Sequence, residues 1–147
     1  MKTKKLGNIV ELYISKKEYD GRLNQSELII DSDGVFVDKF YGKNKTRSVL
    51  LTSLDSYNIA KENDIKIKYG QLGENILIDF DLNLLKLNVR LKIGDVILEI
   101  SQHCTICNSL SKIDHKLPKL LEKDRGVFAK VIEGGIIKQG DKIEYLE

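Results

Sequence analysis

The stretch "GVFAKVIEGGIIKQGDKIEYLE", residues 126–147, shows the pattern that decides the fold. Its first and last runs, 126–133 and 141–147, are rich in apolar and β-branched residues, which favour strands. Between them Gly134, Gly135 and Gly140 mark turns, because glycine takes a positive φ or a close backbone approach without steric cost. The segment therefore predicts short strands joined by tight turns.

Similar runs recur at 7–14, 26–30, 47–52, 74–80 and 95–101. Their spacing is irregular and no long helices alternate with them, which favours a closed or half-closed antiparallel barrel over a parallel sheet. Two short helices are expected. One covers 54–63 and is capped by Ser53; the other covers about 105–113, and Pro118 can begin its continuation. We predict a single mainly β domain with minor α structure over residues 1–147.

Composition excludes several classes of protein. With 41% hydrophobic and 31% charged residues, the chain is neither disordered nor embedded in a membrane. No apolar run approaches the ~20 residues of a membrane helix, and Glu11 breaks the apolar stretch near the N-terminus, so no secretory signal is expected. The 24 basic and 22 acidic side chains are interspersed, unlike the basic stripe of a duplex binder. We predict a cytoplasmic protein that binds neither membrane nor nucleic acid.

The stretch "SQHCTICNSL", residues 101–110, contains both cysteines of the chain, Cys104 and Cys107. Without an export signal, free thiols are expected. A structural zinc site needs four ligands, yet only His103 and His115 could complete it, and adjacent residues such as His103 and Cys104 rarely converge on one ion. A thioredoxin-type couple belongs in a βαβ setting, which the strand pattern does not indicate.

The two cysteines favour different interpretations. Free cysteine is commonly a small buried apolar residue, and Cys104 fits that description. Cys107 lies near the start of the second expected helix, whose N-terminus can stabilise a thiolate. The local sequence therefore favours one working thiol.

Four segments add a resemblance that none of these patterns gives alone. They are "GVFVDKFYGKNKTRSVLLT" (34–52), "GQLGENILI" (70–78), "LKIGDVILEISQHCTIC" (91–107) and "RGVFAKVIEGGIIKQGDKI" (125–143). In this order they resemble the MOSC family, the domain found at the C-terminus of molybdenum cofactor sulfurases and as small stand-alone bacterial proteins. The resemblance spans most of the chain from about residue 30 onward and implies a small β-barrel-like domain with a few helices.

The resemblance places Cys107 at the family cysteine. The usual family run has an arginine three residues before that cysteine and a proline directly before it, where this chain has Cys104 and Ile106. The implied ligand is the pterin-based molybdenum cofactor (molybdopterin) or a sulfurated form of it. Cys107 would carry persulfide sulfur or ligate the metal, since soft thiolates suit both tasks.

Basic residues are candidates for binding the phosphate of such a ligand. Arg47 is the first, because a guanidinium binds phosphate with two parallel hydrogen bonds. Lys43 and Lys45 would share its face if residues 43–47 are extended. Both lysines also fit a solvated basic loop. Arg125 could reach an anion or close a salt bridge.

Four further residues complete the candidate site. Asp38 could orient a ligand amine or cap a turn, and Glu74 and Asn75 could bind the pterin or shape a tight turn. His103, through its nearness to the family cysteine, could shuttle protons.

The expected function is that of a sulfur carrier or transfer domain, or of a small reductase component that depends on molybdenum cofactor. The chain is too short to include its own desulfurase, so a cysteine desulfurase using pyridoxal phosphate, or an electron-donor protein, would be a partner, with a molybdoenzyme as acceptor. Two alternatives remain: a non-catalytic module that binds an anionic ligand or a partner protein, and a small zinc-binding C-x-x-C protein.

Overall fold

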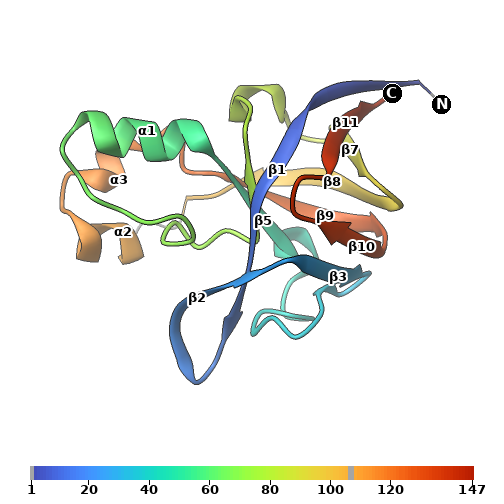
Figure 1. Ribbon diagram of the computed structural model, residues 1–147, viewed down its shortest axis with the longest axis horizontal. Coiled ribbons are helices and arrows are strands. Elements are labelled where there is room, and N and C mark those ends of the chain that lie inside the picture. Colours follow the sequence, from blue (N-terminus) through green and yellow to red (C-terminus); the bar gives the residue numbers. More distant parts are fainter. Residues whose placement is uncertain (1, 106–107) are drawn as a thin grey trace.

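The computed structural model describes residues 2–105 and 108–147 (Figure 1). Its strands are β1 (Thr3–Lys16), β2 (Tyr19–Gln25), β3 (Glu27–Asp31), β4 (Gly34–Val35), β5 (Val49–Ser53), β6 (Ile76–Ile78), β7 (Arg90–Ile93), β8 (Val96–His103), β9 (Val127–Glu133), β10 (Gly135–Lys138) and β11 (Lys142–Leu146). Its helices are α1 (Leu54–Glu62), α2 (Asn108–Ile113) and α3 (Leu117–Leu120), with 3₁₀ turns η1 (Lys45–Arg47) and η2 (Leu82–Leu84). Every predicted strand run contains a strand, and the mainly β fold is confirmed.

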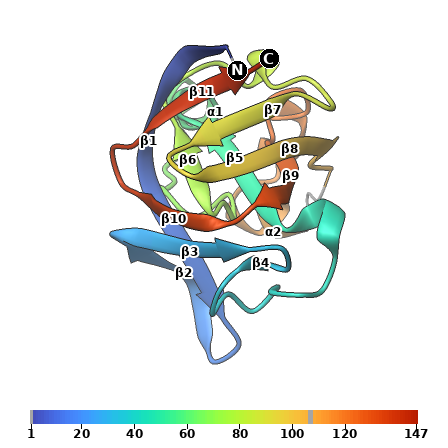
Figure 2. The ribbon, with the colours of Figure 1, turned by 90° about the vertical axis from the view of Figure 1, so that its right-hand side faces the viewer.

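The largest sheet closes into a barrel. Its strands follow the order β11-β7-β8-β9-β5-β6-β1, and pairing of β1 with β11 completes the ring. Figure 2 shows β11, β7 and β8 side by side on one wall. Neighbours in the ring are antiparallel except for β5 and β6, which pair in parallel. A parallel pair needs a crossover connection, and α1 lies in that connection.

Smaller elements are attached to the barrel. β2 extends the sheet beyond β1, and β10, β3 and β4 form a second sheet. Figure 1 shows α1, α2 and α3 grouped on one side of the barrel. Among the described residues, no helix has the length and apolar character needed to cross a membrane.

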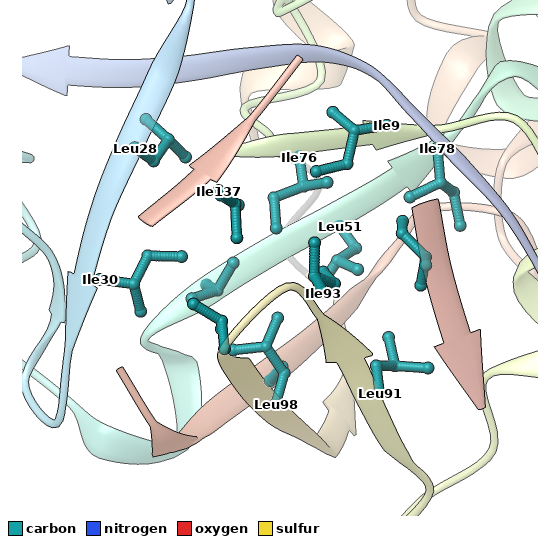
Figure 3. Close-up of a cluster of buried hydrophobic side chains, with 14 of the residues drawn as sticks. Ile9, Leu28, Ile30, Leu51, Ile76, Ile78, Leu91, Ile93, Leu98 and Ile137 are labelled. Atoms are coloured by element: carbon teal, nitrogen blue, oxygen red, sulfur yellow. The ribbon is translucent and has the colours of Figure 1, made fainter. Parts of the chain in front are cut away.

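The barrel interior is filled with aliphatic side chains, as Figure 3 shows for Ile9, Leu51, Ile93 and their neighbours. A second apolar cluster lies between the helices and the barrel wall. β6 contributes side chains to both apolar clusters, because successive side chains point to opposite faces of a strand. Ile76 and Ile78 face the barrel interior, whereas Leu77 packs with the helices. The helices therefore cover one barrel wall and make both of its faces buried.

Ser53 and Pro118 lie at helix starts as predicted, and α2 (Asn108–Ile113) lies within the range of the second expected helix. The Ser53 hydroxyl accepts a hydrogen bond from the Asp55 backbone N–H at 3.1 Å and caps α1. Pro118 lies in the first turn of α3, where its missing N–H costs nothing. Strands β2, β4, β7 and β10 fall outside the predicted runs, since polar residues interrupt their apolar pattern or they are very short.

Candidate functional site

A cavity of about 430 Å³ lies where the ends of several elements meet. Its apolar walls come from Leu50 on β5, Leu72 in the turn before β6, Phe128 on β9 and Cys104 directly after β8. Phe40, in the segment before η1, adds an aromatic ring. A cavity of this volume with mainly apolar walls is typical of a small-molecule site.

Cations surround the cavity. Arg22, Lys43, Arg47 and Arg125 all line it. The sequence contains four arginines, each within the described residues, and Arg90 is the one that lies elsewhere. Such a concentration of positive charge suits an anionic ligand.

Arg47 occupies its place through the geometry of η1. The Asn44 side chain accepts a hydrogen bond from the Thr46 backbone N–H at 3.1 Å, which starts the turn. The Arg47 guanidinium then lies 5.4 Å from the centre of the Phe128 ring, a cation–π distance. The condition under which Lys43 and Lys45 would share the face of Arg47, an extended segment 43–47, is not met, because this cap forms a 3₁₀ turn. Lys45 is exposed and does not line the cavity, whereas Lys43 does.

Asp38 caps a turn and also lines the cavity. One carboxylate oxygen accepts hydrogen bonds from the Ser15 backbone N–H at 2.7 Å and the Ser15 hydroxyl at 3.2 Å. The other accepts one from the Phe40 backbone N–H at 3.0 Å. The turn interpretation of Asp38 is therefore realised, and the capped turn places Phe40 at the cavity.

Asn75 connects two strands beneath the cavity. Its side-chain oxygen accepts from the Leu50 N–H at 3.1 Å, and its amide nitrogen donates to the Tyr13 carbonyl at 3.2 Å. The residue is buried and lines the cavity floor, with its side chain engaged by the backbone of β1 and β5. Asn75 therefore fixes the shape of the site.

Glu74 lies behind the cavity wall and is fully buried. Its carboxylate accepts a 2.5 Å hydrogen bond from the Tyr57 hydroxyl, which in turn accepts one from the Gly70 N–H at 3.0 Å. Burial, followed by the charge of Glu74, raises the pKa of Tyr57. This network holds the turn that carries Leu72 and Gly73 into the cavity wall.

Arg125 is buried at the cavity, two residues before the start of β9. The following residue, Gly126, has φ +142°, and a Cβ there would lie 2.8 Å from the Leu51 carbonyl oxygen. Glycine therefore allows the chain to approach β5 closely between Arg125 and the start of β9.

The histidine and the cysteines are distributed differently. Cys104 lines the large cavity, whereas His103 lines a second cavity of about 210 Å³ with Lys86 and Lys123. Cys107, predicted as the catalytic thiol and metal ligand, lies outside the described residues. Within residues 2–105 and 108–147, no three His, Cys, Asp or Glu side chains are grouped to hold a metal ion.

Arg22 is the site residue that sequence reasoning missed. It comes from β2, whose sequence "YDGRLNQ" has no apolar periodicity and lies before the segments that carry the family resemblance. A single arginine there gave no signal. The pairing of β2 with β1 is what brings it to the cavity.

Comparisons with known proteins agree on the fold. The YuaD protein from Bacillus subtilis has a TM-score of 0.82 at 21% identity, covering 98% of this chain and 97% of that one. YiiM from Escherichia coli has a TM-score of 0.72 at 15% identity, covering 95% and 70%. YiiM from Geobacillus stearothermophilus has a TM-score of 0.71 at 13% identity, covering 99% and 76%.

No curated protein matches the chain in sequence. A family does: the MOSC domain matches residues 38–144, and thus most of the sequence, including Asp38, Arg47, Asn75 and Arg125 of the cavity. The chain belongs to the MOSC domain family.

Proposed function

We propose that this protein binds molybdenum cofactor in the cationic cavity and uses Cys107 to carry sulfur or to ligate the metal. The observation that carries the proposal is the gathering of Arg22, Lys43, Arg47 and Arg125 around one cavity with apolar walls. Membership of the MOSC family, which is associated with proteins of molybdenum cofactor metabolism, supports it.

The residues present fit such a ligand. Guanidinium groups are suited to the phosphate, because they can form two parallel charge-assisted hydrogen bonds with it. Leu50, Leu72 and Phe128 offer apolar surface for a flat pterin. When bound, the cofactor would supply a redox-active metal or a transferable sulfur atom. The protein would hold the phosphate, exclude water from the ring and present a thiol.

The protein would act with partners. As a sulfur carrier it would receive sulfur from a cysteine desulfurase and deliver it to a molybdoenzyme. As a reductase component it would receive electrons from a donor protein. Both roles need the Cys107 thiol, and they differ in whether that thiol carries sulfane sulfur.

The test is elemental analysis of protein purified without oxygen from a host that produces the cofactor. Wild type should contain molybdenum, and Cys107→Ser should lose it if the thiol ligates the metal. If Cys107 carries sulfur instead, wild type should contain persulfide that Cys107→Ser lacks. Cys104→Ser is the matched control and should resemble wild type.

Other outcomes would identify the alternatives. One zinc per chain that is lost in both cysteine variants would contradict the proposal and establish a zinc site. Retained binding of an anionic ligand with neither metal nor persulfide would identify a non-catalytic binding module, for which Cys107→Ser should change little.

A further inference from the structure

We infer that Arg22 of β2 binds the anionic group of the ligand and forms, with Arg125, the phosphate subsite of the cavity. The identification of this anion as part of molybdenum cofactor rests on the proposed function. The assignment of Arg22 to an anion rests only on the geometry and charge of the cavity.

The Arg22 guanidinium is held in a defined position. Its carbon lies 5.7 Å from the centre of the Phe40 ring, and one of its nitrogens lies 3.9 Å from the Asp38 carboxylate. On another side, a Cβ added at Gly73 would lie 3.2 Å from a guanidinium nitrogen. Phe40, Asp38 and Gly73 all line the cavity, so the guanidinium is placed against the cavity wall and not free in solvent.

The described part of the chain leaves the hydrogen-bonding capacity of the Arg22 guanidinium unused. Its side chain is only 19% exposed, yet none of the side chains and backbone groups that the structure describes accepts a hydrogen bond from the guanidinium. The 3.9 Å separation from Asp38 is too long for one, and the Asp38 oxygens already accept from Ser15 and Phe40. A largely buried guanidinium has five donors, so this arrangement favours an external acceptor.

The charge balance points the same way. The pKa of Arg22 is lowered from its ordinary value, first by burial and also by the positive charge of Arg125, against the opposite effects of Asp38 and Glu74. The positive charge of Arg125 thus disfavours the charged form of Arg22. An anion bound between them would remove that repulsion, which is a differential interaction that favours the bound state.

The cavity cations differ in exposure. Arg22 and Arg125 are the more buried pair, whereas Lys43 and Arg47 are exposed. Buried guanidinium groups form the stronger bonds with phosphate, while exposed cations chiefly steer an anion toward the site. We therefore assign the phosphate contact to Arg22 and Arg125, and capture of the anion to the exposed residues.

The experiment is calorimetric titration of the full chain with inorganic phosphate at constant ionic strength. Wild type should bind phosphate saturably, and Arg22→Gln should bind about tenfold more weakly, the loss of roughly one charge-assisted contact. Arg90→Gln is the matched control, because it removes the same charge from a residue that pairs with Glu99 outside the cavity. Its affinity should stay within about twofold of wild type.

Two results would overturn the inference: an Arg22→Gln affinity equal to that of Arg90→Gln, or no saturable phosphate binding by wild type. Arg22→Lys serves if the glutamine variant fails to fold, since it keeps the charge but loses the planar fork, and it should bind several-fold more weakly than wild type. Equal affinity of the lysine variant and wild type would then count against the guanidinium.

The molybdenum and persulfide measurements separate this inference from the proposed function. Phosphate binding that depends on Arg22, in a protein with neither molybdenum nor persulfide, would support the subsite and contradict the proposed chemistry. Molybdenum bound through Cys107, together with a phosphate affinity that is unchanged in Arg22→Gln, would support the proposed chemistry and contradict the subsite.

Discussion

Two cavities are lined by neighbouring residues at the end of β8, and they differ in the burial of their charged side chains. The larger contains the buried side chains of Asp38 and Arg125, the half-buried Arg22 and mainly apolar walls. The smaller is lined by His103 and by the exposed lysines Lys86 and Lys123. His103, the last residue of β8, and Cys104, which directly follows the strand, line different cavities. Nearness in sequence is therefore a poor guide to membership of a site.

The largest effect is expected from Tyr57→Phe, which breaks the network behind the wall of the larger cavity. The buried Glu74 carboxylate would lose its 2.5 Å donor, so the free energy of unfolding should fall by about 2–3 kcal/mol. Urea denaturation measures this. The control Tyr69→Phe alters an exposed ring that packs against Tyr57 and should change stability by less than about 0.5 kcal/mol. Equal effects of the two variants would mean that the Tyr57–Glu74 bond contributes little.

The same variant has a predicted pH dependence. The pKa of Tyr57 is raised in the folded state, so its neutral hydroxyl stabilises the folded protein. This contribution to the free energy of unfolding is complete below the ordinary tyrosine pKa of 10.0 and is lost as the pH rises above that value. Tyr57→Phe should therefore flatten the decline of stability at alkaline pH. A variant with the same alkaline slope as wild type would contradict this account.

Asp38→Asn tests the buried carboxylate of the larger cavity. It removes an acceptor of the Ser15 and Phe40 hydrogen bonds and should lower the free energy of unfolding by about 1–2 kcal/mol. It also removes negative charge beside Arg22, so surviving folded protein should bind phosphate more tightly. The exposed Asp33→Asn is the control for both measurements. Weaker phosphate binding in Asp38→Asn would show that the carboxylate positions Arg22 for the anion.

Arg47 and Lys45 provide a matched pair from one 3₁₀ turn. Arg47→Gln should weaken phosphate binding about fivefold, because it removes an exposed cation that lines the cavity. Lys45→Gln removes the same charge outside the cavity and should change affinity by less than about twofold. Equal losses would indicate that only the overall charge of the turn matters.

The smallest effect is expected from His103→Gln, in the smaller cavity. Phosphate affinity should stay within about 1.5-fold of wild type, since His103 does not line the larger cavity. The same titration measures it. A loss approaching that of Arg47→Gln would show that the two cavities act together.

The sequence was informative where local chemistry determines structure. Apolar runs predicted the barrel strands, and Ser53 predicted the start of α1, because strand preference and capping depend on neighbouring residues. The family resemblance led to Asp38, Arg47, Asn75 and Arg125, which the fold brings to one cavity.

The remaining site features depend on contacts between distant segments. Arg22 reaches the cavity only through the pairing of β2 with β1, and a polar strand of this kind has no periodic signal. Lys45 would share a face with Lys43 in an extended segment, but the Asn44 cap produces a turn. Glu74 has a donor in Tyr57, from a different element, and that bond keeps it behind the wall.

The pairing of β1 with β11 determines when the barrel can close during folding. Thr3 lies opposite Leu146, so the barrel closes through residues from opposite ends of the sequence (Figure 1). During synthesis β1 is made long before β11, so the part of its edge that pairs with β11 stays unpaired until then. Such distant pairings slow folding and leave strand edges open to association with other chains. Conditions that slow synthesis or raise chain concentration should therefore affect the yield of this protein more than that of a helical domain of equal length.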